Sequence, residues 1–290
     1  MRGNIYLLLA AFLWGTTFVA QLVGMDGIGP FTYGMGRYII GFFVVLLVWQ
    51  CFGRQRARAK AEGTYQSGWR YGLGAGCIMF IASAFQQTAL LFTTAGKTAF
   101  ITCLYIIFVP IFARLIGKVI RLENWLGAII AVIGLYCLSV QGALDLNYGD
   151  ILALICSVFW AGHILFIDRY AERADNIEIS AAQLGVCAVL NTIFCLVLED
   201  FTWGELWAAA IPILYAAVLS SGVAFTLQIM GQKTADPAPA AVIMSLESVF
   251  GVLGGWLILD ERMAGVEVVG CVLMLAGMLV TQSRVILKKV

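Results

Sequence analysis

The sequence predicts an all-α polytopic membrane protein with ten transmembrane helices, arranged as two inverted five-helix repeats. Three observations predict it: an extreme apolar composition, apolar runs of spanning length joined by short connections, and a likeness between the two halves. Of the 290 residues, 61% are hydrophobic and only 12% are charged, whereas soluble domains are roughly half apolar and about a quarter charged. A soluble fold of this size could not bury so much apolar surface.

The apolar runs are long enough to cross a bilayer, whose hydrocarbon core of about 30 Å requires about 20 helical residues. They lack the alternation of membrane β-barrel strands, and a helix satisfies its own backbone groups in lipid. Short connections leave no room for a separate soluble domain. The predicted helices are Asn4–Val23, Phe31–Phe52, Trp69–Phe92, Ala95–Ile116, Asn124–Gln141, Asp150–Tyr170, Ile177–Leu198, Leu206–Gln228, Ala238–Leu259 and Gly265–Gln282.

The distribution of charge predicts the orientation, because basic residues in short loops are retained on the cytoplasmic side. In the ten-helix arrangement Lys and Arg gather on one side, most densely between Arg54 and Arg70, and only Arg37, Lys97 and Arg262 fall elsewhere. The acidic residues of the opposite side are Asp26, Asp145, Asp150, Glu199, Asp200, Glu205, Asp260 and Glu261. Both termini are therefore expected in the cytoplasm.

Residues 1–141 and 142–290 form the two predicted repeats. Trp14 and Trp160 each lie ten residues after the start of a similar segment, at Asn4 and Asp150. Two glycines seven residues apart recur in the last helix of each half, as Gly127 and Gly134 and as Gly270 and Gly277. Five helices is an odd number, so the second copy enters the membrane from the opposite side. Inverted repeats are a recurrent plan of transporters, in which two bundles rock around a site near the midplane.

A series of motifs resembles the drug/metabolite transporter superfamily, in particular its ten-helix EamA-like members, over essentially the whole chain. The matching features are Leu13-Trp14-Gly15, Arg37, the stretch from Tyr105 to Pro110, Gly149-Asp150 through Trp160-Ala161, Ser245-Leu246-Glu247, Asp260-Glu261 and Gly270. Relatives commonly carry proline directly after the glutamate, where this chain has Ser248. No proline kink is expected there. Flexibility or close packing is assigned instead to glycines that follow, Gly251, Gly254 and Gly255.

The resemblance implies secondary-active transport of small metabolites, often amino acids or related compounds and often outward, across a bacterial cytoplasmic (inner) membrane. The implied partners are a small-molecule substrate, the lipid bilayer and a coupling proton or counter-substrate. Substrates vary widely across such families. The alternative substrate is an organic cation of the quaternary ammonium type, and the alternative without transport is a channel or scaffold. No enzyme is expected, because the sequence lacks nucleophile, paired-aspartate and multi-histidine motifs.

Glu247 is the most informative candidate, since it lies near the middle of its predicted helix. A carboxylate there costs roughly 3 kcal/mol and is usually partnered or faces water. Three roles are open: a proton carrier, a counter-charge for a cationic group of the substrate, or a structural hydrogen-bonding group between helices.

Two other ionisable candidates lie within predicted helices. Arg37 is expected to attract a substrate carboxylate, pair with an acidic residue or anchor its helix at the outer interface. His163 is the single histidine, and it is expected either to relay protons or to be a neutral side chain hydrogen-bonded in the bundle.

Aromatic and uncharged polar side chains complete the candidate site. Trp14, Tyr105 and Trp160 are expected to line a cavity or to pack between helices; aromatic faces that bind cations contribute roughly 1–2 kcal/mol. The polar candidates, for binding substrate or neighbouring helices, are Gln86, Gln87, Gln183, Asn191 and Gln228.

No cofactor, metal or nucleic acid is expected. The eight cysteines show no paired spacing of the metal-site type and are interpreted as free, small packing residues. A single histidine provides no metal site by itself. The sequence contains neither a Walker A motif nor a dinucleotide fingerprint, so the energy for transport is expected from an ion or substrate gradient.

Overall fold

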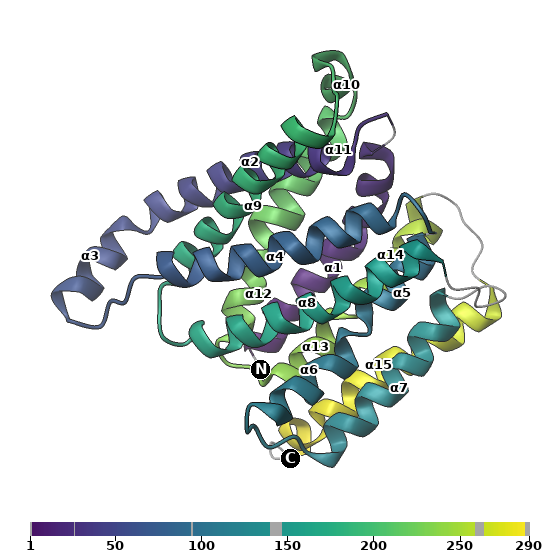
Figure 1. Cartoon of the computed structure of the whole chain (residues 1–290). Helices are drawn as coiled ribbons and strands as arrows, with labels where there is room; N and C mark the ends of the chain where they lie inside the picture. The colour runs from purple at the N-terminus through teal and green to yellow at the C-terminus, as the bar shows by residue number, and fades with distance from the viewer. Residues whose placement is uncertain (1, 26, 94, 140–146, 259–263, 288–290) are drawn as a thin grey trace.

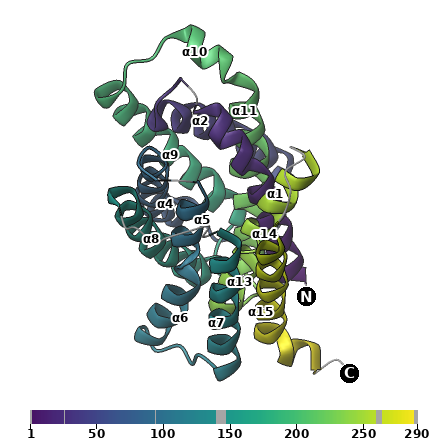
Figure 2. The same cartoon turned by 90° about the vertical axis from the view of Figure 1, so that its right-hand side faces the viewer.

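The computed structural model is a bundle of helices (Figures 1 and 2). It describes residues 2–25, 27–93, 95–139, 147–258 and 264–287, and within these ranges it contains helices and connections but no strand. The helices are α1 (Arg2–Gly24), α2 (Pro30–Cys51), α3 (Gly53–Ala61), α4 (Trp69–Ala89), α5 (Ala95–Cys103), α6 (Tyr105–Leu115), α7 (Leu122–Ser139), α8 (Tyr148–Tyr170), α9 (Asn176–Leu198), α10 (Trp203–Ala208), α11 (Ala210–Tyr215), the π-helix η1 (Ala216–Ala224), α12 (Phe225–Gln232), α13 (Pro237–Met244), α14 (Glu247–Ile258) and α15 (Gly265–Leu287).

Several predictions concern residues outside the described ranges. The boundary between the two predicted repeats, at 141 and 142, is one of them. The charged residues Asp26, Asp145, Asp260, Glu261 and Arg262 are others, and the side chain of Lys97 is not described.

Within the described part of the chain, six helical segments are long and apolar enough to cross a membrane, with a mean hydropathy between 1.7 and 2.1. They are Pro30–Cys51, Thr98–Leu115, Tyr148–Tyr170, Asn176–Leu198, Ala210–Gln232 and Gly265–Ser283. These segments agree with a polytopic membrane protein. A count of ten crossings goes beyond this observation.

Two of the predicted helices are broken near their middle. The predicted Ala95–Ile116 divides at Leu104 into α5 and α6, and the predicted Ala238–Leu259 divides at Ser245 and Leu246 into α13 and α14. At both breaks a backbone amide donates to the carbonyl three residues earlier, from Leu104 to Ile101 and from Leu246 to Ile243, each at 3.2 Å. Such a tightened turn interrupts the regular α-helical pattern.

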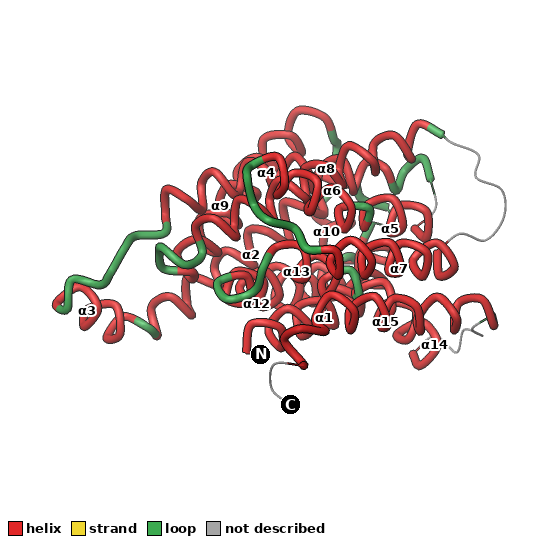
Figure 3. The backbone as a smooth tube through the Cα atoms, turned by 90° about the horizontal axis from the view of Figure 1, so that it is seen from below, coloured by secondary structure: helices red, strands yellow, loops and turns green. Residues whose placement is uncertain are grey.

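The basic segment after α2, predicted as a connecting loop, contains the short helix α3. Its residues are mostly Ala, Arg, Lys and Gln, which favour helix. Arg58 pairs with Glu62 one turn later at 2.7 Å. Figures 1 and 3 show α3 projecting from one end of the bundle, beyond the ends of its neighbours.

The four glycines of the predicted repeat lie against one another in the packed pair α7 and α15. A Cβ added to Gly134 would meet the carbonyl oxygen of Gly270 at 2.7 Å, and one added to Gly127 would meet that of Gly277 at 2.6 Å. The reverse contacts are equally short, 2.6 Å in both cases. Only glycine therefore allows the two backbones to approach so closely.

Helix α9 carries a carboxylate near each end that binds the start of a neighbouring helix. Glu199 accepts from the backbone amides of Phe31 and Thr32 at 2.9 and 2.7 Å, at the beginning of α2. Glu178 accepts from the amide of Gly68 at 2.9 Å, directly before α4. Both contacts satisfy amide donors that a helix start leaves unpaired, and they fix α9 against α2 and α4.

Candidate functional site

A cavity of about 60 Å³ lies inside the bundle, where side chains from both halves of the chain meet. Its lining residues are Trp14, Thr17, Gln21, Arg37, Tyr38, Gln86, Thr102, Tyr105, Trp160, Ile164, Ser220, Phe225, Gln228, Met244 and Glu247. Typical small-molecule pockets measure about 300–1,000 Å³. In this conformation the cavity therefore accommodates only a few water-sized molecules.

Seven of the eleven predicted site residues line this cavity: Trp14, Arg37, Gln86, Tyr105, Trp160, Gln228 and Glu247. The other four do not: Gln87, His163, Gln183 and Asn191.

Glu247 is the first residue of α14 and lies directly after the break in the helix. Cys103, the last residue of α5, directs its thiol towards the carboxylate, with 3.5 Å between Sγ and Oε1. Gly15 of α1 packs against the same turn, since a Cβ added there would lie 2.6 Å from the Glu247 carbonyl oxygen. The two breaks thus meet at the carboxylate, and among the described residues no cation pairs with it.

Arg37 is 4% exposed, and its guanidinium is bound by neutral groups. Nε donates to Ser221 Oγ at 3.1 Å and Nη2 to Ser220 Oγ at 3.0 Å. The ring of Tyr38 lies 4.9 Å from Cζ, a cation–π contact. No carboxylate within the described ranges pairs with this guanidinium. A buried charge usually has an opposite partner, and the described residues provide none for this guanidinium.

Aromatic rings form one side of the cavity. The rings of Trp14 and Phe225 are 5.1 Å apart in an edge-to-face arrangement, and those of Trp160 and Phe225 are 6.0 Å apart and nearly parallel. Trp14 Nε1 donates to the carbonyl of Ser220 at 3.4 Å. Such rings provide a rigid wall whose faces attract cations.

Three of the four predicted residues outside the lining have a hydrogen-bond partner within the bundle, namely His163, Gln183 and Asn191, whereas Oε1 of the buried Gln87 has none among the described residues. His163 is fully buried, with Nε2 at 3.0 Å from Gln183 Oε1 and its ring edge-on to Trp160 at 5.6 Å. Asn191 Nδ2 donates to the Cys187 carbonyl at 2.7 Å. His163 therefore lies behind the wall of the cavity, where its ring contacts Trp160.

Sequence reasoning missed eight lining residues: Thr17, Gln21, Tyr38, Thr102, Ile164, Ser220, Phe225 and Met244. Ser220 lies in the π-helix η1, a rare geometry that is frequent at functional sites. The consecutive pair Ser220 and Ser221 within an apolar run is the one signal in the sequence that would have indicated it.

A second cavity, of about 410 Å³, lies where the linkers before α7 and α13 meet the start of α1 and the end of α15. It contains none of the predicted candidates. The start of α1 and the end of α15 are joined there by a hydrogen bond of 2.8 Å from Asn4 to Gln282. A buried apolar cluster lies against both cavities, because it includes Met244 of the first and packs against Ala235 of the second.

Metal-binding groups are not assembled anywhere in the described ranges, where no three His, Cys, Asp or Glu side chains gather. The cysteines are free thiols.

Comparisons with known proteins agree with this architecture. Residues 1–140 and 147–282 match the EamA-like transporter family. An uncharacterised transporter of Archaeoglobus fulgidus is 30% identical over 290 residues, covering 98% of this chain and 87% of that protein. The uncharacterised transporter YwfM of Bacillus subtilis is 28% identical over 300 residues, covering 98% and 95%.

Two further comparisons are more distant. The threonine/homoserine exporter RhtA of Salmonella typhimurium is 23% identical over 163 residues, or 54% of each protein. A solved crystal structure with 20% sequence identity superposes with a TM-score of 0.80 over 97% of this chain and 96% of that chain, and so shares the fold. The family covers nearly the whole chain, and its helices are apolar enough to span a bilayer. The chain therefore belongs to the EamA-like transporter family of the drug/metabolite transporter superfamily, and it is an integral membrane transporter.

Proposed function

We propose that this transporter exports amino acids or closely related metabolites across the cytoplasmic membrane by alternating access. The observation that carries the proposal is that a buried guanidinium, Arg37, and a carboxylate, Glu247, line one cavity without an ion pair among the described residues. An amino acid presents the two complementary charges on groups bonded to the same carbon atom.

Each charge has a natural counterpart on a zwitterion. The Arg37 guanidinium, oriented by Ser220 and Ser221, is suited to bidentate binding of a carboxylate. The Glu247 carboxylate accepts from the ammonium group, with Trp14 and Trp160 beside it. The name of RhtA, an exporter of threonine and homoserine, agrees with this class of substrate.

Ten crossings and inverted halves are the arrangement we propose for this transport. Under the predicted symmetry α1 corresponds to α8, α2 to α9, α4 to η1 with α12, and the broken pair α5 and α6 to the broken pair α13 and α14. The contacts support this correspondence. Helix α4 packs on α8, and their counterparts, η1 with α12 and α1, also pack on each other. Helix α1 packs on α14, and their counterparts, α8 and α6, do the same. The two repeats would then cover residues 1–141 and 142–290.

We propose cytoplasmic termini for the same arrangement. The hydrogen bond between Asn4 and Gln282 supports a common side for the start of α1 and the end of α15. The second cavity would then open towards the cytoplasm, with the apolar cluster between it and the substrate cavity. Reporter fusions test this: ends reported in different compartments would exclude an even number of crossings and the symmetry.

The alternative substrate is an organic cation of the quaternary ammonium type. It is favoured by the combination of Glu247 with Trp14, Tyr105 and Trp160 around one cavity. Such a cation carries no carboxylate for Arg37 to bind, and this is the physical difference between the two proposals.

Counterflow in proteoliposomes decides between the substrates. Vesicles containing the purified chain are loaded with threonine, homoserine or choline, and uptake of the labelled compound is followed. We expect saturable, counter-substrate-stimulated uptake of the amino acids and little of choline. Uptake of choline alone would favour the alternative, and unsaturable flux would indicate a channel. A coupling proton would show as uptake that responds to an imposed pH gradient.

A further inference from the structure

Cations at one end of the bundle are held against aromatic rings. Arg56 Cζ lies 4.1 Å from the ring centroid of Trp49, and Lys60 Nζ lies 4.7 Å from that of Tyr65. Farther along, Arg70 is held in the same way over the neighbouring tyrosine ring, at 4.5 Å. We call three residues of this end the basic surface: Arg56, Lys60 and Arg70.

One buried carboxylate positions two of these rings. Glu178 is 1% exposed and accepts from Trp49 Nε1 at 3.1 Å and from the Tyr65 hydroxyl at 2.6 Å. It also accepts from Ser67 Oγ at 3.0 Å and the Gly68 amide at 2.9 Å. The two rings that carry Arg56 and Lys60 are thus the two aromatic donors to Glu178, and the loop between α3 and α4 is ordered around them.

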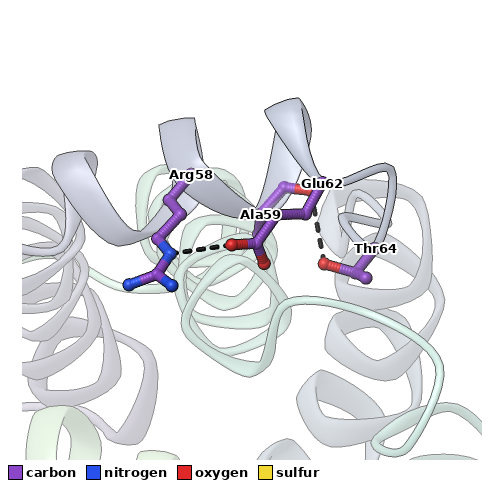
Figure 4. Close-up of polar contacts among 4 residues, drawn as sticks. All are labelled: Arg58, Ala59, Glu62 and Thr64. Carbon is purple, nitrogen blue, oxygen red and sulfur yellow. Dashed lines mark hydrogen bonds and ion pairs between the residues drawn. The ribbon is translucent and has the colours of Figure 1, made fainter.

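The acidic groups next to the basic surface are already occupied. Glu178 is saturated by four donors. Glu62 pairs with Arg58, and Figure 4 shows its side chain pointing back along α3 towards that guanidinium. The Thr64 hydroxyl donates to the Ala59 carbonyl at 3.3 Å, which closes the end of α3. Among the described residues, neither of these acidic groups forms an ion pair with the basic surface.

The location of the basic surface suits a lipid headgroup. Helix α2 has 22 residues, or about 33 Å at 1.5 Å per residue, which matches a hydrocarbon core of about 30 Å. Helix α3 therefore begins where the headgroup layer begins, and aromatic rings are typical of this depth. A loop whose only role was to direct membrane insertion would need positive charge, but its cationic side chains would not need to be held in fixed positions.

We propose that the basic surface is a binding site for the headgroups of anionic phospholipids. The guanidinium groups donate to phosphate oxygens, with Lys60 as an additional point charge. Glu178 is a positioning residue: it fixes the rings that hold two of the cations. This site is separate from the substrate cavity, and the inference does not rest on the proposed substrate.

The test is a lipid titration of the full-length chain in detergent, read as the shift of its unfolding temperature with phosphatidylglycerol or with phosphatidylcholine. We expect a saturable upward shift with phosphatidylglycerol only, smaller at high salt. Arg70→Gln with Lys60→Gln is expected to weaken the apparent affinity about thirty-fold, equivalent to about 1 kcal/mol for each cation. Tyr65→Phe keeps the ring below Lys60 but removes a donor to Glu178, and is expected to weaken binding to a smaller extent.

A matched control removes the same charge elsewhere. Arg114→Gln with Arg121→Gln takes two exposed cations from another connection, and is expected to leave the affinity for phosphatidylglycerol unchanged. Equal weakening by both pairs would overturn the proposal, because only general charge would then matter. Equal shifts with the two lipids would also overturn the proposal. Binding of an acidic peptide, together with no preference between the two headgroups, would overturn it as well. The residues replaced in both double variants are exposed, so we expect these variants to unfold at the wild-type temperature in pure detergent. If one double variant is unstable, the single variant Lys60→Gln provides the same comparison.

Discussion

The thiol of Cys103 lies 3.5 Å from the carboxylate of Glu247, and this contact joins the helices broken at Leu104 and at Ser245. Cys103 ends α5, and Glu247 begins α14. Each break exposes a helix end to the interior, where a polar side chain can be presented without leaving the helical scaffold. The cavity proposed for the substrate therefore lies where these helices are interrupted.

Glu247→Gln keeps the shape of the side chain but removes its charge. We expect uptake of amino acids to fall at least about tenfold, because a hydrogen bond to a charged group contributes about 1.5–3 kcal/mol. Counterflow at several pH values measures it, with Glu172→Gln, an exposed position outside the spans, as the control. Unchanged and equally pH-dependent uptake in the Glu247 variant would remove this residue from the mechanism.

Arg37→Gln distinguishes the two substrate classes. Without a guanidinium, substrates that carry a carboxylate lose their counter-charge, so we expect their KM to rise about ten- to a hundredfold, from a charged hydrogen bond worth about 1.5–3 kcal/mol. Compounds without a carboxylate, such as choline, are expected to be unaffected. If uptake of both classes falls equally while the protein unfolds at a lower temperature, Arg37 acts only as a structural residue.

Gly15→Ala tests the close approach of α1 to the turn of Glu247. The new Cβ would lie 2.6 Å from the Glu247 carbonyl oxygen and 2.6 Å from Phe250 Cβ, so the helices must separate, at a cost of about 1–3 kcal/mol. We expect a lower unfolding temperature and reduced transport. Gly162→Ala is the matched control, because its Cβ would meet only Ile78 Cγ2 at 4.0 Å. That variant should be neutral or stabilised by about 0.5–1 kcal/mol, and equal losses in both would contradict the packing argument.

Tyr65 lies outside the spans, and we expect its hydroxyl to make the unfolding temperature fall as the pH becomes alkaline. Burial, and the hydrogen bond to Glu178, raise the pKa of its hydroxyl above the ordinary value of 10.0. Because the folded-state pKa is raised, the stabilising contribution is complete below pH 10 and is lost as the pH rises through the raised pKa. We expect the wild type to lose more stability than Tyr65→Phe above pH 10. Parallel unfolding curves for the two proteins across that range would show that the bond contributes nothing.

Glu199→Ala removes the acceptor at the start of α2. The amides of Phe31 and Thr32 lose their partner, and the hydroxyl of Thr32 keeps only Cys195 Sγ, at 3.2 Å. An unsatisfied buried donor costs about 1–3 kcal/mol, so we expect a clear fall of the unfolding temperature. Glu199→Gln, which retains an acceptor, should recover part of it, and a wild-type temperature in the alanine variant would mean that water replaces the carboxylate.

The sequence predicts the helical class well because apolar runs and sparse charge are properties of the whole chain. It also indicates the cavity residues that are unusual for their surroundings. Glu247 and Arg37 are ionisable groups within apolar runs, and Trp14 and Trp160 recur at the same place in both halves. Such residues are conspicuous because lipid makes each of them costly.

Other parts of the site have no comparable signal in the sequence. Thr102 carries a hydroxyl that can bond to the backbone of its own helix, so nothing in its type separates lining from packing. Neither break, at Leu104 or at Ser245, has a proline at that position, so no helix-breaking residue marks it in the sequence. His163 and Gln183 are as polar as the lining residues. The face of a helix that turns to the cavity is decided by packing between helices, and the pattern of apolar runs carries no information about that packing.

The two carboxylates of α9 have a mechanical consequence. A helix bound to α2 near one end by Glu199 and to the start of α4 near the other by Glu178 resists tilting against either neighbour. Under the proposed alternating access we therefore expect these three helices to move together and the two interrupted helices to bend. Leu104 and Ser245 would then be the hinges about which the cavity opens to one side of the membrane or the other.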